Sequence, residues 1–273
     1  MAGLPEQAQL VAAPIGFTGP EAVRYDPEQD VYFVSNFGSG NSGDTDNNGF
    51  ISRMLPDGTV ERVAFIAGGT GGVILHAPRG MTIVGDTLWV ADADAVRAFH
   101  RRTGAPLATA RFAEFDVGFL NDVAPGPDGI YVTDTGKNRI YRIADGIVTI
   151  ALADTALGRP NGITWDRGSG RFIVVPYGGA TVIRAWRPGS RMVTEIGRGS
   201  GAIFDGVEVL ADGRILVASQ ADSSLHLFTQ GRGRAILRTA GRPADIAVDT
   251  KRNRVAIPFI ALNRVEIWQL PPE

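Results

Sequence analysis

One short pattern recurs six times along the chain, and it constrains the fold more than any other feature of the sequence. Each copy consists of an apolar run, a turn rich in Asp, Gly or Pro, and a second apolar run. Two apolar runs joined by such a turn are typical of a β-hairpin. The copies begin "GPEAVRYDPEQDVYFVSN", "APRGMTIVGDTLWVADA", "FLNDVAPGPDGIYVTDT", "RPNGITWDRGSGRFIVVPY", "IFDGVEVLADGRILVASQ" and "RPADIAVDTKRNRVAIPF".

A third apolar run follows each hairpin, and in the first five copies a further turn leads to a fourth. The sixth copy ends with the chain at "LPPE", while the N-terminal "QAQLVAA" is a spare strand before the first copy. A ring of units whose two ends share the last unit explains both observations. We therefore expect an all-β fold, a six-bladed β-propeller with its last blade closed by the N-terminal strand. Residues 1–273, of which 44% are hydrophobic, suffice to form it as a single domain.

Composition excludes several other classes of protein. The chain has no cysteine, so disulfides, zinc–thiolate sites and cysteine nucleophiles are excluded. The formal net charge is −2 and no basic run is present, so we expect no nucleic-acid partner. No apolar run reaches membrane-spanning length, and "MAGLPEQAQL" lacks the pattern of a signal peptide. We expect a monomer that binds a small-molecule substrate away from membranes. Its compartment stays open: cytoplasmic or, if a leader was removed, periplasmic or secreted.

Aligning the six copies brings one position to the start of each first strand, and in a propeller these strands line the central channel. This ring position is occupied, in chain order, by Glu21, Arg79, Asn121, Asn161, Asp205 and Ala244. Two of these residues present carboxylates and two present amide oxygens. Calcium takes about six to eight oxygen ligands, and two carboxylates balance a divalent charge. A hydrogen-bonded polar plug, with Arg79 pairing the acids, explains the same residues, and spacing alone leaves both interpretations open.

A glycine-rich segment, "GSGNSGDTDNNGF" at residues 38–50, contains Asp44, Asp46 and Asn48 in the order that opens a calcium-binding EF-hand loop. That loop needs a glutamate at its twelfth position and flanking helices. Leu55 stands at the twelfth position here, and the residues around it alternate as in a strand. An EF-hand is excluded. We expect a surface loop that overhangs the channel mouth as a lid or rim.

The residues at the ring position also carry a family resemblance. The motifs "GPEAVRYD", "LNDVAPGPDGIYVTD", "RPNGITWD" and "FDGVEVLADGRILVAS" resemble those of the senescence marker protein/gluconolactonase superfamily, and the likeness covers nearly all of the chain. The group is related to the paraoxonases, diisopropyl fluorophosphatase and the strictosidine synthase-like proteins. In it a divalent ion, usually calcium, is held at the channel mouth by a Glu, two Asn and an Asp. The resemblance implies, as metal ligands, Glu21, Asn121, Asn161 and Asp205.

The chain departs from the pattern of this group at two places. Arg79 puts a cation beside the expected ion, where it either pairs with an acid or holds an anionic or carbonyl-bearing substrate. Ala22 stands where the paraoxonases have an acid that binds a second, structural calcium, so we expect no second calcium of that kind. Asp122 follows Asn121 as in the paraoxonases, and we expect it to orient a backbone loop.

Two more side chains are expected near the same mouth. His76 precedes the second copy and is a candidate general base, because its charge changes near neutral pH; a hydrogen-bonded loop histidine is the alternative. Tyr177 follows the second strand of the fourth copy and is a candidate to line the substrate pocket. The sequence contains no G-x-S-x-G nucleophile motif and no phosphate-binding glycine loop before a helix.

Two functional hypotheses follow. The first is a hydrolase of the lactonase, esterase or phosphotriesterase type, in which calcium or another divalent ion polarises a carbonyl or phosphoryl oxygen. Asp205 or a bound water would attack, His76 or a ring carboxylate would take the proton, and Arg79 and Tyr177 would contact the substrate. The second is a non-catalytic ligand-binding propeller whose metal is structural or absent. The native substrate stays open.

Overall fold

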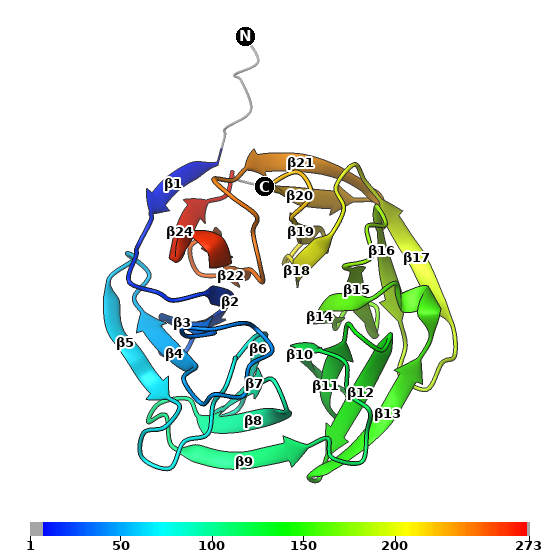
Figure 1. Cartoon of the computed structure of the whole chain (residues 1–273). Coiled ribbons are helices and arrows are strands. Elements are labelled where there is room, and N and C mark those ends of the chain that lie inside the picture. Colours follow the sequence, from blue (N-terminus) through cyan, green and yellow to red (C-terminus); the bar gives the residue numbers. More distant parts are fainter. Residues whose placement is uncertain (1–7, 272–273) are drawn as a thin grey trace.

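A computed structural model describes residues 8–271, which form β-strands and two short 3-10 helices. The strands are arranged in a ring around a central axis (Figure 1). Residues 1–7, most of the stretch searched for a signal peptide, lie outside the described part, as do residues 272–273. No helix in the described residues is long and apolar enough to cross a membrane.

Four sheets have four strands each, and within each sheet every strand is hydrogen-bonded to the next. The first contains β2 (Pro20–Asp26), β3 (Val31–Asn36), β4 (Phe50–Met54) and β5 (Val60–Ala67). The second contains β6 (Met81–Val84), β7 (Thr87–Ala91), β8 (Ala95–His100) and β9 (Pro106–Arg111). The third contains β10 (Leu120–Gly126), β11 (Gly129–Asp134), β12 (Arg139–Ala144) and β13 (Ile147–Ala153). The fourth contains β1 (Gln9–Ala12), β24 (Arg264–Gln269), β23 (Arg254–Phe259) and β22 (Ala247–Asp249).

The remaining strands form one eight-stranded sheet. Its order is β14 (Pro160–Asp166), β15 (Arg171–Pro176), β16 (Val182–Trp186), β17 (Val193–Arg198), β21 (Arg232–Arg238), β20 (Ser224–Thr229), β19 (Ile215–Ser219) and β18 (Phe204–Val209). The two 3-10 helices are η1 (Thr155–Leu157), before β14, and η2 (Ile260–Leu262), before β24.

The prediction of a six-bladed propeller is therefore wrong, because the described residues form four four-stranded sheets and one of eight strands. The eight-stranded sheet is joined by a parallel bridge between Arg198 of β17 and Arg232 of β21. Glycines at this junction permit the close approach: a Cβ on Gly199 would lie 3.2 Å from the Cα of Gly233. The repeat pattern describes each unit by itself, so it contains no information about how the outer strands of neighbouring units meet.

The expected pairing of the chain ends is present. Strand β1 pairs antiparallel with β24, with Leu10 opposite Trp268. Innermost in Figure 1 stand β2, β6, β10, β14, β18 and β22, which contact one another in a closed circuit. The starts of these strands therefore meet around one channel, although the strands come from all parts of the chain.

The hydrophobic core lies between neighbouring sheets. Phe33 of β3 and Leu88 of β7, both fully buried, belong to one cluster that joins the first and second sheets. Tyr131 of β11 and Phe172 of β15 join the third sheet to the eight-stranded one, with ring centres 4.6 Å apart. Because each sheet packs both faces on neighbours, the inner strand ends are held in fixed positions around the channel.

Candidate metal and substrate site

Irregularities in the inner strands place the oxygen-bearing side chains of the ring. Glu21 of β2 sits at a shift in the pairing register between Pro20 and Ala22. The inner strands β10, β14 and β18 shift register over the matching residues, which include Asn121, Asn161 and Asp205. Such bulges re-aim side chains next to functional sites. In these four inner strands, the bulge lies where the side chain turns from the sheet face toward the channel.

These four side chains line one cavity of about 480 Å³, and Tyr177 lines it with them. The volume is in the range of small-molecule sites. Arg79, Ala244 and His76 are not among the described residues that line it. The structure therefore brings together at one cavity the four ring residues with oxygen ligands, while the side chains of Arg79 and His76 do not line it.

The two acids of the ring are buried and incompletely paired. Glu21 is 4% exposed and Asp205 is 3% exposed. Burial, followed by the charge of Asp205, raises the pKa of Glu21 well above its ordinary value. Burial raises the pKa of Asp205 to about 7, against a hydrogen bond of 2.5 Å from Gln220 Nε2. Oε2 of Glu21 and Oδ1 of Asp205 are both buried without a hydrogen-bond partner.

The amide of Asn121 is oriented by its neighbours. The hydroxyl of Thr135 donates its proton to the carbonyl of Pro160 over 2.6 Å, so it acts as acceptor toward Asn121. Asn121 Nδ2 donates to it over 3.0 Å. The oxygen is thus the amide atom of Asn121 that is left for a ligand. Two unpaired carboxylate oxygens and an oriented amide oxygen fit a hard divalent cation.

Asp122, behind this ring, is held by backbone groups. Its Oδ2 accepts from the amide of Ile163 at 2.8 Å and its Oδ1 from that of Val123 at 2.7 Å. Asp122 thus holds the backbone of β10 and β14, whereas the sequence predicted that it orients a loop. Burial raises the pKa of Asp122 to about 7.

The two terminal nitrogens of Arg79 donate to backbone carbonyls, while its buried Nε has no hydrogen-bond partner among the described residues. Its Nη1 donates to the carbonyl of Leu120 at 2.6 Å, and its Nη2 donates to the carbonyl of Ser42. The guanidinium carbon lies 3.8 Å from the ring centre of Phe119. Burial lowers the pKa of Arg79 to about 10, so it remains charged at neutral pH. These contacts tie the β3–β4 loop to the start of β10, and they support a positioning role rather than contact with substrate.

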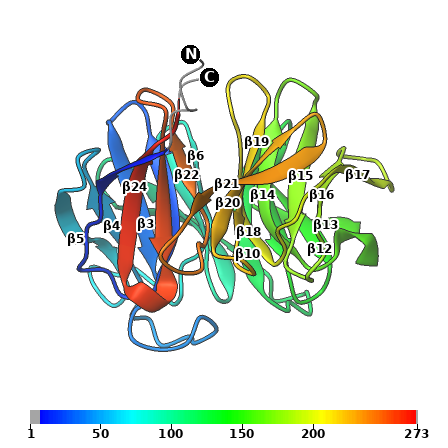
Figure 2. The same cartoon turned by 90° about the horizontal axis from the view of Figure 1, so that it is seen from above.

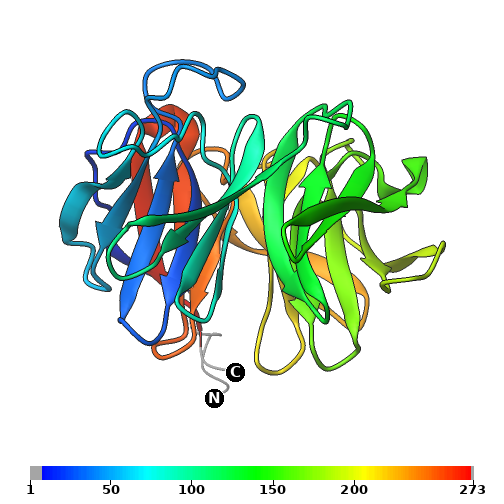
Figure 3. The same ribbon diagram turned by 90° about the horizontal axis from the view of Figure 1, so that it is seen from below.

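The β3–β4 loop, residues 37–49, stands out from one face of the ring (Figures 2 and 3). Ser42 from this loop lines the cavity. The acids of the glycine-rich segment bond within the loop: Asp44 accepts from the amide of Asn41 at 2.8 Å, and Asp46 accepts from Asn48. The strand β4 follows directly, which confirms that no EF-hand is present.

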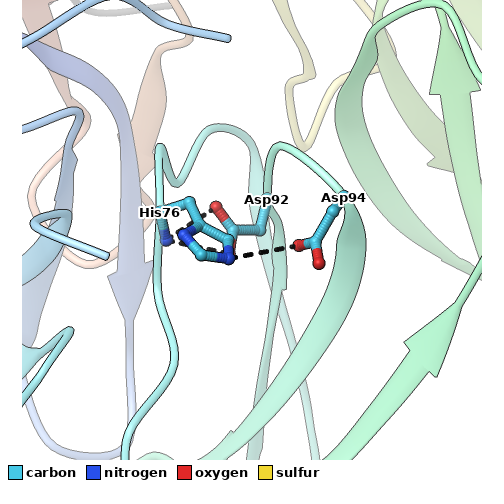
Figure 4. A group of neighbouring side chains, drawn as sticks. All are labelled: His76, Asp92 and Asp94. Atoms are coloured by element: carbon cyan, nitrogen blue, oxygen red, sulfur yellow. Dashed lines mark hydrogen bonds and ion pairs between the residues drawn. The ribbon is translucent and has the colours of Figure 1, made fainter. Parts of the chain in front are cut away.

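His76, Asp92 and Asp94 form a second group near this face, with possible metal-ligating atoms within 4.8 Å of one another (Figure 4). Asp92 accepts from the backbone amides of His76, Ala77 and Ala93 at 2.7–3.1 Å. It also accepts from Arg97 Nε at 2.5 Å, and Arg97 pairs with Asp94 as well. The carboxylate of Asp92 is therefore fully used by amides and a guanidinium, whereas Asp94 is exposed and is bonded at Oδ1 to Arg97.

The imidazole of His76 serves the same loop as Arg79. Nδ1 of His76 accepts from the amide of Asn47 at 3.0 Å, and Oδ1 of Asn47 accepts from the amide of Leu75 at 2.8 Å. These bonds support the loop-histidine alternative. The role of His76 as a general base stays a prediction.

A second repeat position, which was not predicted from the sequence as a position, also builds the site. The residue directly after each second strand lines the cavity in five units, as Phe37, Thr135, Tyr177, Gln220 and Ile260. In four of them its amide donates to the residue two before the ring position, as from Tyr177 to Arg159 at 2.8 Å. The same alignment of copies contains this signal. It was overlooked because the residue types differ too much to suggest one chemistry.

No protein-family model and no curated protein sequence matches the chain. Solved structures do match the chain. A protein provisionally described as a gluconolactonase matches with a TM-score of 0.71 at 17% identity, over 98% of this chain and 94% of that one. A gluconolactonase from Xanthomonas campestris matches with a TM-score of 0.71 at 18% identity, over 99% of both chains.

A different named activity appears on the same fold. An inactive variant of virginiamycin B lyase from Staphylococcus aureus, with quinupristin, matches with a TM-score of 0.66 at 14% identity. It covers 97% of this chain and 100% of that one. At such identities the likeness shows the fold alone. The gluconolactonases, which the sequence motifs resemble, are thus among the solved structures that share this fold.

Proposed function

We propose that the protein is a divalent-ion-dependent hydrolase, with calcium as the ion, which opens a lactone or cleaves a related ester or phosphotriester. One observation carries this proposal: two buried carboxylates with unpaired oxygens face a cavity beside the amides of Asn121 and Asn161. An unpaired buried carboxylate costs stability unless a cation compensates it. The fold likeness to gluconolactonases supports a lactone among the candidate substrates.

The chain's residues have distinct tasks in this proposal. Glu21, Asn121, Asn161 and Asp205 would hold the ion, which supplies polarisation of the carbonyl or phosphoryl oxygen when bound. Hydrolysis joins a water oxygen to the acyl carbon and breaks the bond from that carbon to the alkoxide oxygen. The water proton passes to a ring carboxylate and then to the leaving alkoxide.

The aromatic lining has a second task. Phe37, Phe119 and Tyr177 line the same cavity as the ring oxygens. They offer apolar surface to the body of a substrate and limit the access of bulk water, which strengthens electrostatic interactions at the inner end. Tyr177 therefore retains its predicted role as a substrate contact.

A panel of lactones, aryl esters and phosphotriesters, assayed with calcium and after EDTA treatment, tests the proposal. We expect hydrolysis of at least one class that EDTA abolishes and calcium restores. Asp205→Asn should lose on the order of a thousandfold in kcat/KM, since metal-assisted polarisation contributes several kcal/mol. Asp94→Asn, outside the cavity, is the control and should retain activity. Calcium binding without hydrolysis of any substrate would favour the non-catalytic binding propeller instead.

The role of His76 is tested with the same substrates. His76→Gln retains a hydrogen-bond acceptor for the amide of Asn47 but removes the titrating ring. If His76 only holds the loop, we expect activity within about fivefold, because one such bond contributes about 0.5–1.5 kcal/mol. A hundredfold loss, together with disappearance of one limb of the pH–rate profile, would instead establish His76 as the general base.

A further inference from the structure

The cavity lining contains one cationic side chain among the described residues, that of Arg159. Arg159 is exposed, whereas the two ring acids are buried. The cavity therefore has an acidic inner end, formed by Glu21 and Asp205, and a basic outer end at Arg159. A ligand with one anionic group would be oriented by this difference.

The guanidinium of Arg159 is available for a ligand. Within residues 8–271 it makes no hydrogen bond and no ion pair, and its carbon lies 5.4 Å from the ring centre of Tyr177. This arrangement differs from that of Arg79, whose guanidinium is buried and bonded to carbonyls. An arginine beside an aromatic ring presents its planar fork edge to carboxylates and phosphates.

The backbone of Arg159 is fixed on both sides. Its amide donates to Oδ1 of Asn138 at 2.6 Å, and its carbonyl accepts from the amide of Tyr177 at 2.8 Å. Its φ of 63° lies in the left-handed region, as do the φ values of Gly19 and Ile203 at the matching positions of other units. The conformation is thus shared with two other units, whereas the arginine side chain with this conformation is particular to this unit. Arg159 is held in place without the use of its charge.

From this geometry we infer that Arg159 binds an anionic substituent of the substrate, a carboxylate or a phosphate, so that the substrate is an anionic lactone or ester. The inference rests on the proposed function, because it assigns the substrate class of the same site. The substituent lies at the outer end and the reacting carbonyl at the inner end, which keeps the two negative groups away from each other. Tyr177 packs against the substrate beside that substituent.

Matched substrates test this inference. D-glucaro-1,4-lactone carries a carboxylate where D-glucono-1,4-lactone carries a hydroxymethyl group, and 6-phosphoglucono-δ-lactone and glucono-δ-lactone form the phosphate pair. We expect wild-type kcat/KM to favour the anionic member of one pair, which also tells carboxylate from phosphate. Arg159→Gln should lose on the order of ten- to a hundredfold with that member, as for a lost charge-assisted hydrogen bond. The kcat/KM of this variant with the neutral member of the pair should change less than twofold.

Two controls make the result specific. Arg159→Lys keeps the charge without the fork and should recover part of the loss. Arg191→Gln removes an exposed arginine that does not line the cavity, and it should leave kcat/KM unchanged with both substrates. Equal losses with anionic and neutral lactones in Arg159→Gln, or no loss with either, would overturn the inference while leaving the hydrolase intact.

Binding measurements separate this inference from the proposed function. If no lactone is hydrolysed, calorimetry with D-glucuronate, glucose 6-phosphate and D-glucose decides the matter of charge. We expect the wild type to bind an anionic sugar more tightly than Arg159→Gln does, and added salt to reduce the difference. Glucose should bind both proteins alike. Equal binding of the anionic sugars by the two proteins, or none by either, would reject Arg159 as an anion site.

Discussion

Two acidic groups lie near the same face of the molecule and differ in whether their buried carboxylate oxygens all have hydrogen-bond partners. Asp92, in the group with His76 and Asp94, accepts hydrogen bonds from three backbone amides and from Arg97. In the channel ring, Glu21 and Asp205 each keep one buried oxygen without a partner. Closeness of acids and unsatisfied carboxylate oxygens thus point to different groups. The proposed ion site follows the unsatisfied oxygens, because buried polar atoms are almost always paired.

The largest expected effect is a loss of stability when the fully hydrogen-bonded carboxylate of Asp92 is removed. Asp92→Asn leaves the guanidinium of Arg97, of which the side chain is 3% exposed, without its buried charged partner. We expect a loss of about 3–5 kcal/mol in the free energy of unfolding, measured by denaturant titration. Asp94→Asn is the control, because its side chain is 39% exposed and it should cost under about 1 kcal/mol. Neither variant should alter the response to calcium; a lost response in Asp92→Asn would move the ion to this group.

The pH dependence of the stability of the metal-free protein tests the incompletely hydrogen-bonded acids of the channel ring. The pKa of Asp205 is raised in the folded state to about 7, so the folded protein holds its proton more tightly than the unfolded chain does. This contribution to stability is fully present below the unfolded pKa, near 4, and is lost as pH rises to about 7. The loss is at most about 1.4 kcal/mol per pH unit for one acid. Melting temperatures from pH 4 to 8 should fall less steeply in Asp205→Asn, which has no proton to lose there.

Calcium should restore the stability that the metal-free protein loses as pH rises. An ion that binds only the folded protein stabilises it by about 2.7 kcal/mol at a free concentration of ~100 times its dissociation constant. Asn161→Ala should lose most of this rise in melting temperature. Asp46→Asn, in the exposed β3–β4 loop, should keep it, because that side chain bonds within the loop. A rise that survives in Asn161→Ala and disappears in Asp46→Asn would place the ion in the loop.

The smallest expected effect concerns Arg79, which lies between the two groups. Arg79→Met removes donors to the carbonyls of Leu120 and Ser42, and an unpaired buried carbonyl costs about 1–3 kcal/mol. We expect faster proteolysis within residues 37–49 and an equal or tighter affinity for calcium, because a nearby cation is removed. A raised KM with the proteolysis rate unchanged would show instead that Arg79 contacts the substrate, as the sequence analysis expected.

Much of the site was predictable because it repeats. Aligning the copies identified Glu21, Asn121, Asn161 and Asp205 as one position, and the structure brings all four to one cavity. The second lining position, that of Thr135 and Gln220, has the same periodicity but no common residue type. The engagement of Arg79 could not be predicted, because it depends on backbone carbonyls and a ring supplied by other units. The accessibility of Arg159 could not be predicted either, because it depends on which side chains approach its guanidinium in the folded protein.

By itself, the sequence determined the strands, their hairpins, the pairing of the N-terminal strand with the last unit and the position of the ring. These follow from local turns and from a pattern of apolar residues that every copy contains. Tertiary structure alone decided the eight-stranded sheet, because Gly199, directly after β17, and Gly233 of β21 meet only after folding. It also decided which acids remain unsatisfied, because the fold brings hydrogen-bond partners such as Arg97 of β8 and Gln220, directly after β19, to the acids in space.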